Sequence, residues 1–369
     1  MFLRLFLLIL QLESRSSLVQ CSGSQSVVVQ EGYLKWIKQM SSLRHSVFQK
    51  AEKQKHKPCL TIKVEKKTGA GDFVSIQRAI DSIPEVNLCR VIISIGPGAY
   101  KEKVEIPATK AYISMEGAGA EKTVIEWDDT ADRIGPKGRP LGTFGSATVA
   151  VNSPYFIAKN ITFKVSVDDD VDVEHCTIAA LRSIGKASSG TEDICRHCSI
   201  CGVQVPWSPR HTLRPHGRHY FKECYIEGSI DFVFGDGLSL YDGCHLHAIT
   251  NSYGALTAQK RESMLEESGF SFINCRVTGS GALYLGRAWG TFSRVVFAYT
   301  YMDKIITPRG WYNWGDKNRE MTVFYGQYKC SGPGAEFGGR VSWSRELTSE
   351  EAKPFISLTF IDGQEWIKL

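Results

Sequence analysis

From residue 60 onward, apolar and polar residues alternate in short runs that are broken by Gly, Asn and Asp. Such alternation is typical of β-strands that bury one face. One helix is expected to interrupt the runs at Val74–Ile83, just after a glycine turn at residues 69–72. The pattern predicts an all-β body whose first strands are Leu60–Val64, Arg90–Ile95, Ala111–Met115 and Ala147–Val151.

A weak repeat recurs further along the chain. Each copy has an apolar residue, two variable residues, a cysteine, one variable residue and another apolar residue. The cysteines at 224, 244 and 275 lie 20 to 31 residues apart, which suits one rung of a coiled parallel β-helix. In such a fold, small apolar side chains stack into an interior ladder, and each rung needs its neighbours to bury its inner face. The copies are Cys195–Ile200, Phe221–Ile226, Tyr241–Leu246 and Phe272–Val277.

The N-terminus has a different character. Met1–Leu10 is a short apolar run with one early positive charge, and small and polar residues follow it, as in a secretory signal peptide. The run is too short to span a bilayer, so we expect a secreted, extracellular protein that does not sit in a membrane.

The next segment, residues 25–57, is polar and has apolar residues at helical spacing, which predicts a helical arm. The expected organisation is therefore a signal peptide at 1–23, a helical arm at 24–59 and a β-helix domain at 60–369.

The charge and the cysteine pattern give no support for nucleic-acid binding or for a metal site. The 369 residues carry 44 Lys and Arg against 39 Asp and Glu, a mild net charge of +5 that gives no argument for nucleic-acid binding. The run Cys195-x-x-Cys198-x-x-Cys201 resembles a zinc or iron–sulfur motif, but no second ligand cluster has convincing spacing. We interpret it as part of a thiol ladder or an incidental disulfide. Asp168–Asp170 lacks the spacing of a calcium loop, so no metal site is predicted.

Two charged residues stand inside apolar strands. Asp231 lies in Ser229–Gly235, and Arg287 lies in Ala282–Gly290. A buried charge is unfavourable unless it is paired, so we predict that Arg287 binds Asp231 and keeps it ionised and oriented. The neighbouring Trp289 offers a flat face on which a sugar ring can stack. The alternative is a buried ion pair that only stiffens the core.

These residues belong to several motifs that resemble plant pectin methylesterases (pectinesterases) of the type without an inhibitor-like pro-domain. The resemblance covers roughly residues 60–163 and 217–369, plus the N-terminal arm. Because several separate motifs occur in the same order, a chance match is improbable. The motifs are Gly98–Glu102, Gly142–Thr148, Gly228–Gly235, Leu285–Trp289 and the C-terminal stretch from Gly310 to Leu369.

The resemblance implies a right-handed parallel β-helix that hydrolyses methyl esters of galacturonan in the cell wall and releases methanol. It implies that Asp231 is the nucleophile, that Arg287 positions it, and that Gln204 stabilises the oxyanion. Thr143 and Trp289 would contact substrate. No metal or organic cofactor is implied. The implied partners are pectin and a proteinaceous pectinesterase inhibitor, and the chain is expected to be a monomer.

The sequence departs from the family pattern between residues 165 and 216. The family's second aspartate, which protonates the leaving methoxide, is not found after Gln204. His211, which precedes Thr212 and Leu213, stands where that aspartate is expected and is a candidate acid and base. Thr177 takes the place of a substrate-contacting glutamine and is too short to reach equivalently.

A shifted reading frame would account for this segment. One choice of codons for residues 210–216, read from the second base, encodes Asp-Thr-Leu-Tyr-Asp-His, which continues the family pattern. We therefore predict an artefact of the gene model or a lesion in the gene here, which sequencing of the transcript tests. If the chain is made as printed, three readings stay open: a weak esterase, a catalytically silent β-helix that binds pectin, and a misfolded product.

A glycosylation sequon occurs at Asn160–Thr162, in what we expect to be a strand. Together with the predicted export, it suggests a glycoprotein.

Overall fold

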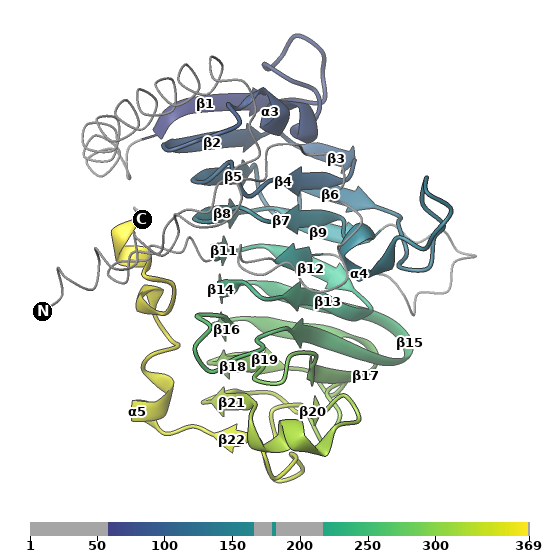
Figure 1. Cartoon of the computed structure of the whole chain (residues 1–369), viewed down its shortest axis with the longest axis vertical. Helices are drawn as coiled ribbons and strands as arrows, with labels where there is room; N and C mark the ends of the chain where they lie inside the picture. The colour runs from purple at the N-terminus through teal and green to yellow at the C-terminus, as the bar shows by residue number, and fades with distance from the viewer. Residues whose placement is uncertain (1–57, 166–178, 182–216, 368–369) are drawn as a thin grey trace, which may run out of the picture. The chain divides into compact units, whose positions relative to one another are not determined.

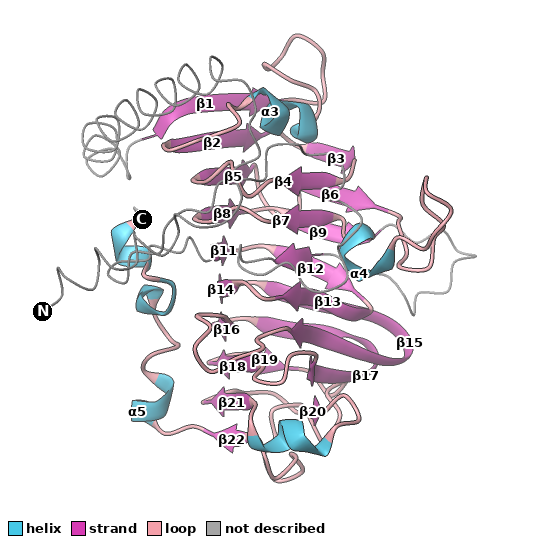
Figure 2. Cartoon of the chain, viewed as in Figure 1, coloured by secondary structure: helices cyan, strands magenta, loops and turns pink. Residues whose placement is uncertain are grey.

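The computed structural model describes residues 58–165, 179–181 and 217–367 (Figure 1). The predictions made for the signal peptide, for the helical arm and for Thr177, Gln204, His211 and the Cys195–Cys201 run lie outside these residues. Figure 2 shows that strands dominate the described part of the chain and that helices are few and short.

Two sheets are built from parallel pairs of strands, and successive strands of each sheet come from successive rungs. The ten-stranded first sheet runs in the order β1 (Pro58–Val64), β2 (Arg90–Ile95), β5 (Ile113–Gly117), β8 (Phe156–Lys159), β11 (Arg218–Lys222), β14 (Leu238–Asp242), β16 (Gly269–Ile273), β18 (Arg294–Ala298), β21 (Phe324–Tyr328) and β22 (Arg345–Glu346).

The second sheet has two faces, because the long strands β15 (His245–Gln259) and β17 (Arg276–Ala288) cross from one to the other at a break in register near residues 249–253. The face before the break, called the leading face, contains β3 (Gly98–Lys101), β6 (Thr123–Trp127), β9 (Thr162–Val165), β12 (Tyr225–Gly228) and β19 (Tyr301–Met302). The face after it, called the site face, contains β4 (Val104–Ile106), β7 (Val149–Val151), β10 (Ala179–Leu181), β13 (Ile230–Gly235) and β20 (Trp311–Tyr312).

This arrangement is the predicted parallel β-helix. The expected interior ladder is confirmed in the described rungs: Cys224, Cys244 and Cys275 are free thiols and all are buried. Beside them runs a stack of aromatic rings with centroids 4.5 to 4.8 Å apart, which joins the rungs along the axis. The stacked residues are Phe221, Tyr241, Phe272 and Phe297.

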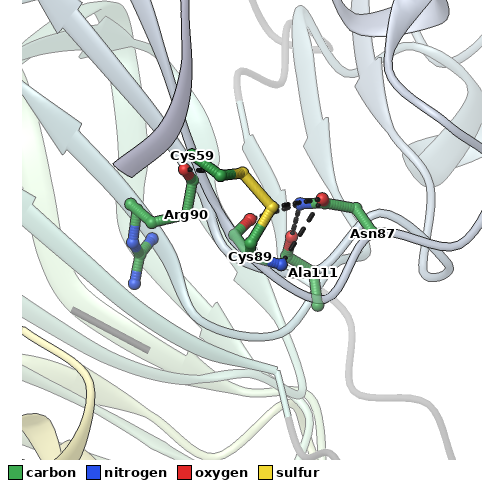
Figure 3. The surroundings of a disulfide bond; sticks show 5 residues. All are labelled: Cys59, Asn87, Cys89, Arg90 and Ala111. Atoms are coloured by element: carbon green, nitrogen blue, oxygen red, sulfur yellow. Dashed lines mark hydrogen bonds between the residues drawn. A yellow bond between two sulfur atoms is a disulfide. The ribbon is translucent and has the colours of Figure 1, made fainter. Parts of the chain in front are cut away.

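The first rung is closed by a helix and a disulfide. Helix α3 (Ile76–Ser82) buries Ile76, Ala79 and Ile80, and the Glu102 carboxylate accepts hydrogen bonds from its first backbone N–H groups. Cys59 and Cys89 form a disulfide that links the start of β1 to the residue before β2 (Figure 3). The disulfide state could not be predicted from the sequence.

The C-terminal segment covers the outer side of the first sheet. Phe355, Phe360 and Trp366 pack there in a second apolar cluster, apart from the interior core. Arg90 ties this segment to the second strand, because its guanidinium donates to the carbonyl oxygens of Tyr155 and Trp366 at 2.7 and 3.1 Å. The remaining short helices are α4 (Gly142–Gly145), η3 (Lys317–Met321), α5 (Ser349–Ala352), η4 (Leu358–Ile361) and η5 (Gly363–Glu365).

One local expectation was wrong. Asn160 does not lie in a strand but in the turn between β8 and β9, with φ of 55°. Asparagine tolerates this left-handed conformation better than most residues, which is why it can end one strand and begin the next. Glycosylation of Asn160 stays a prediction. Within the described residues, no helix has the length and apolar character needed to cross a membrane.

Candidate active site

The predicted pair of Asp231 and Arg287 is present on the site face. Asp231 lies on β13, Arg287 lies on β17, and β15 runs between these two strands. Arg287 donates from Nε to Oδ1 of Asp231 at 2.9 Å and from Nη2 to Oδ2. Two parallel charge-assisted bonds fix the plane of the carboxylate as well as its position.

The backbone of Asp231 is unusual. Its φ is 52°, and the register between β13 and β15 shifts between Ile230 and Val233. A bulge of this kind turns a side chain out of the regular alternation, and aspartate tolerates the left-handed region better than most residues. The bulge therefore changes the direction of the Asp231 side chain from the one that regular in-and-out alternation along β13 would give it.

The Asp231 side chain is buried. The residue is 7% exposed, and burial raises the pKa of its carboxyl above the usual value. The hydrogen bonds and positive charge of Arg287 act in the opposite direction. Arg287 thus favours the ionised form, which is the form that can attack an electrophile.

Two tryptophans lie beside this pair. The ring of Trp314 stacks on the Arg287 guanidinium, with 4.4 Å between the guanidinium carbon and the ring centroid. Trp289 lies nearly parallel to Trp314, with centroids 6.4 Å apart and 15° between the planes. Trp289 was a predicted site residue, whereas Trp314 was not. In the sequence, Trp314 stands out only as part of the motif Gly310–Trp314, which belongs to the family resemblance.

Helix α4 adds a third aromatic ring, Phe144, to the two tryptophans. These three rings are called the aromatic wall. Phe144 of this helix lies 5.5 Å from both Trp289 and Phe234, measured between ring centroids. The Lys260 ammonium lies 5.0 Å from the centroid of the Trp289 ring, which adds a positive charge at the edge of the wall. Thr143 directly precedes Phe144, so the helix that carries the predicted Thr143 also reaches Trp289.

The segment after β17 is held by Arg319 in η3. Arg319 donates from Nη1 to the carbonyl oxygens of Ala288 and Trp289, the latter at 2.6 Å. Its Nε lies 3.5 Å from the Asp316 carboxylate. The backbone that follows Arg287 is thereby anchored to the next rung.

The described residues therefore bring together Asp231, Arg287 and Trp289, and Thr143 is the chain neighbour of Phe144, which contacts Trp289. Gln204, His211 and Thr177 lie outside the described residues, and the roles predicted for them stay predictions. The arrangement offers an oriented carboxylate beside an aromatic and cationic wall, which suits attack on an ester carried by a flat, polar ring.

Comparisons with known proteins identify the family of this chain. The Pectinesterase family model matches residues 62–364. Pectinesterase QRT1 of Arabidopsis thaliana is 43% identical over 305 residues, which cover 82% of this chain and 78% of the relative. Pectinesterase 31 of the same plant is 41% identical and covers 80% of this chain and 91% of the relative.

Solved structures show the same fold. A pectin methylesterase from carrot superposes with a TM-score of 0.61 and 27% identity, covering 84% of this chain and 95% of the carrot chain. The family match, the relatives and the shared β-helix lead to one conclusion: the chain belongs to the pectinesterase family of carboxylic ester hydrolases.

Proposed function

We propose that the chain hydrolyses methyl esters of galacturonan in pectin with Asp231 as the nucleophile. The observation that carries this proposal is the buried Asp231 carboxylate. Two hydrogen bonds from Arg287 hold it next to the aromatic wall.

The chemistry has two stages. A carboxylate oxygen of Asp231 bonds to the ester carbonyl carbon, the bond to the methoxy oxygen breaks, and the methoxide takes a proton and leaves as methanol. Water then hydrolyses the acyl-enzyme, which returns Asp231 and leaves a free carboxylate on that galacturonic acid unit of the chain. Arg287 orients Asp231, while Trp289, Trp314 and Thr143 bind the sugar rings.

Two further groups complete the proposed mechanism. Gln204 donates to the oxyanion, and His211 protonates the methoxide in place of the family's second aspartate. Because loss of a general acid–base group lowers rates by about 10²–10⁴-fold, we expect weak activity if His211 substitutes poorly.

The substrate, the location and the partners are part of the proposal. Two solved pectin methylesterases that share the fold are complexes with hexasaccharides, and a chain of sugars suits the aromatic wall described above. The Cys59–Cys89 disulfide supports export to the cell wall, since disulfides form in oxidising compartments. We further propose that the chain is a monomer and that it binds a proteinaceous pectinesterase inhibitor.

The second candidate function is a silent pectin-binding β-helix. It is favoured by one observation: the second catalytic aspartate is absent while the aromatic wall is intact. The deciding experiment measures methanol release and pectin binding for the wild-type chain and for Asp231→Asn, which keeps the shape of the side chain. Release that disappears in the variant supports the esterase. Binding without release in both proteins supports the silent binder.

A further inference from the structure

A polar cluster on the leading face is not used by the esterase chemistry. His245 and His247 alternate along β15 and therefore point to the same side of the sheet. The strand β12 lies on one side of them and β17 on the other: Glu227 pairs with His247 in register, and so does Thr278. The break in register at residues 249–253 separates this cluster from the site face.

The two imidazoles converge on one oxygen atom. Nε2 of His245 lies 2.7 Å and Nδ1 of His247 lies 2.8 Å from Oγ1 of Thr278. The two nitrogens are therefore no further apart than the sum of these distances. A threonine hydroxyl has one proton, so it donates to one ring nitrogen at most and must accept from the other ring. At most one of the two nitrogens therefore accepts the Thr278 proton, and the other carries N–H. Both nitrogens offer a lone pair once that ring, in its neutral form, changes tautomer.

The rings are also held in place. Tyr225 packs edge-to-face on His245 at 5.0 Å between centroids and stacks on His247 at 5.9 Å. The Tyr225 hydroxyl in turn donates to the Glu227 carboxylate at 2.6 Å. Both histidines are half-buried, so water and small ions reach them while packing limits their rotation.

We propose that His245 and His247 form a two-imidazole chelate for divalent copper on the leading face. Metal–imidazole bonds of about 2 Å place two ligand nitrogens of one ion about 3–4 Å apart, which lies within the upper limit set by the two hydrogen bonds to Thr278. Copper is chosen because it binds nitrogen ligands most tightly among the divalent first-row metals and accepts two imidazoles with two waters in a tetragonal arrangement. Zinc fits less well, since no group of three or more His, Cys, Asp or Glu side chains among the described residues could hold a metal ion. The Glu227 carboxylate, one strand away, offsets part of the positive charge.

The test titrates the full chain with a cupric salt in a buffer that does not bind copper, followed by electron paramagnetic resonance. The wild type should bind one equivalent whose spectrum shows hyperfine coupling to two nitrogens. His245→Gln and His247→Gln should each weaken this binding by about tenfold or more and leave coupling to one nitrogen. Thr278→Ser, which keeps the hydroxyl, is the matched control and should bind like the wild type.

Six other histidines lie outside the described residues, at positions 45, 56, 175, 197, 211 and 216, so stoichiometry alone is not sufficient. A second measurement needs no variant: substoichiometric copper should broaden the NMR signals of the His245 and His247 rings first. The proposal is overturned if the double variant His245→Gln/His247→Gln keeps the wild-type spectrum, or if copper broadens other histidines and leaves these two sharp. Because none of these readouts uses methanol release, failure here says nothing against the proposed esterase.

Discussion

Replacing Arg287 by glutamine removes the cation that faces the buried Asp231. Loss of one partner of a buried ion pair is destabilising by about 3–5 kcal/mol. The lower end applies here, since 29% of the Arg287 side chain is exposed against 9% of the Asp231 side chain. We therefore expect the free energy of unfolding at neutral pH to fall by about 3 kcal/mol.

The same change acts on the nucleophile. Burial already raises the pKa of Asp231, and Arg287 is the only described residue that opposes this, so without Arg287 the pKa moves further up and the ionised fraction at pH 7 falls. The acidic limb of the rate profile should shift to higher pH. Loss of ionised nucleophile and of the two hydrogen bonds that orient it should lower the rate at neutral pH by about 10–100-fold, which corresponds to about 1.4–2.7 kcal/mol in the activation free energy.

Three assays check this reasoning. Urea unfolding gives the stability, methanol release between pH 4 and 9 gives the profile, and carbon NMR of the labelled carboxyl follows the titration of Asp231 even if turnover is slow. Arg287→Lys keeps the charge but loses the paired hydrogen bonds, and it should fall between wild type and Arg287→Gln.

A double-mutant cycle with Asp231→Asn isolates the pair. In the Asp231→Asn background, Arg287→Gln should destabilise the chain far less than in the wild type. An unchanged titration of Asp231 in Arg287→Gln, together with equal costs in both backgrounds, would refute the argument that Arg287 controls this carboxylate.

Other parts of the molecule give three further predictions. Burial lowers the pKa of the His219 ring to about 3. Between about pH 6.5 and pH 3 the unfolded chain therefore binds more protons than the folded chain. The free energy of unfolding should thus fall with decreasing pH, by up to about 1.4 kcal/mol per pH unit. Urea unfolding at pH 7 to 4 should show this slope, and His219→Gln should lack it. Trp314→Leu removes a ring that is proposed to bind the sugar chain and should weaken binding of methylated oligogalacturonides by about tenfold, which corresponds to about 1.4 kcal/mol. Calorimetry that finds equal affinities contradicts this. Cys59→Ser/Cys89→Ser opens a loop of sequence separation 30 and should lower stability by about 2–4 kcal/mol, whereas a wild-type chain that is equally stable with and without reductant would show that the bridge contributes nothing.

Much of the architecture could be predicted from the sequence because a β-helix repeats locally. The recurring Cys224, Cys244 and Cys275 indicated the rungs, and each occupies an equivalent buried place. The helix expected at Val74–Ile83 is observed at Ile76–Ser82. The pairing of Asp231 with Arg287 could also be inferred, since two isolated opposite charges in apolar strands have few other ways to be buried.

The tertiary structure alone decided what surrounds that pair. Trp314, Phe144 and Lys260 come from three separate connections between strands, and nothing in the spacing of these residues shows that they meet at Trp289. The left-handed backbone of Asp231 and of Asn160 was likewise invisible, and the latter made the predicted strand at Asn160 wrong. The physical reason is that a strand's inner and outer residues follow from its own alternation, whereas the loops that form a site are brought together by the stacking register of rungs far apart in the chain.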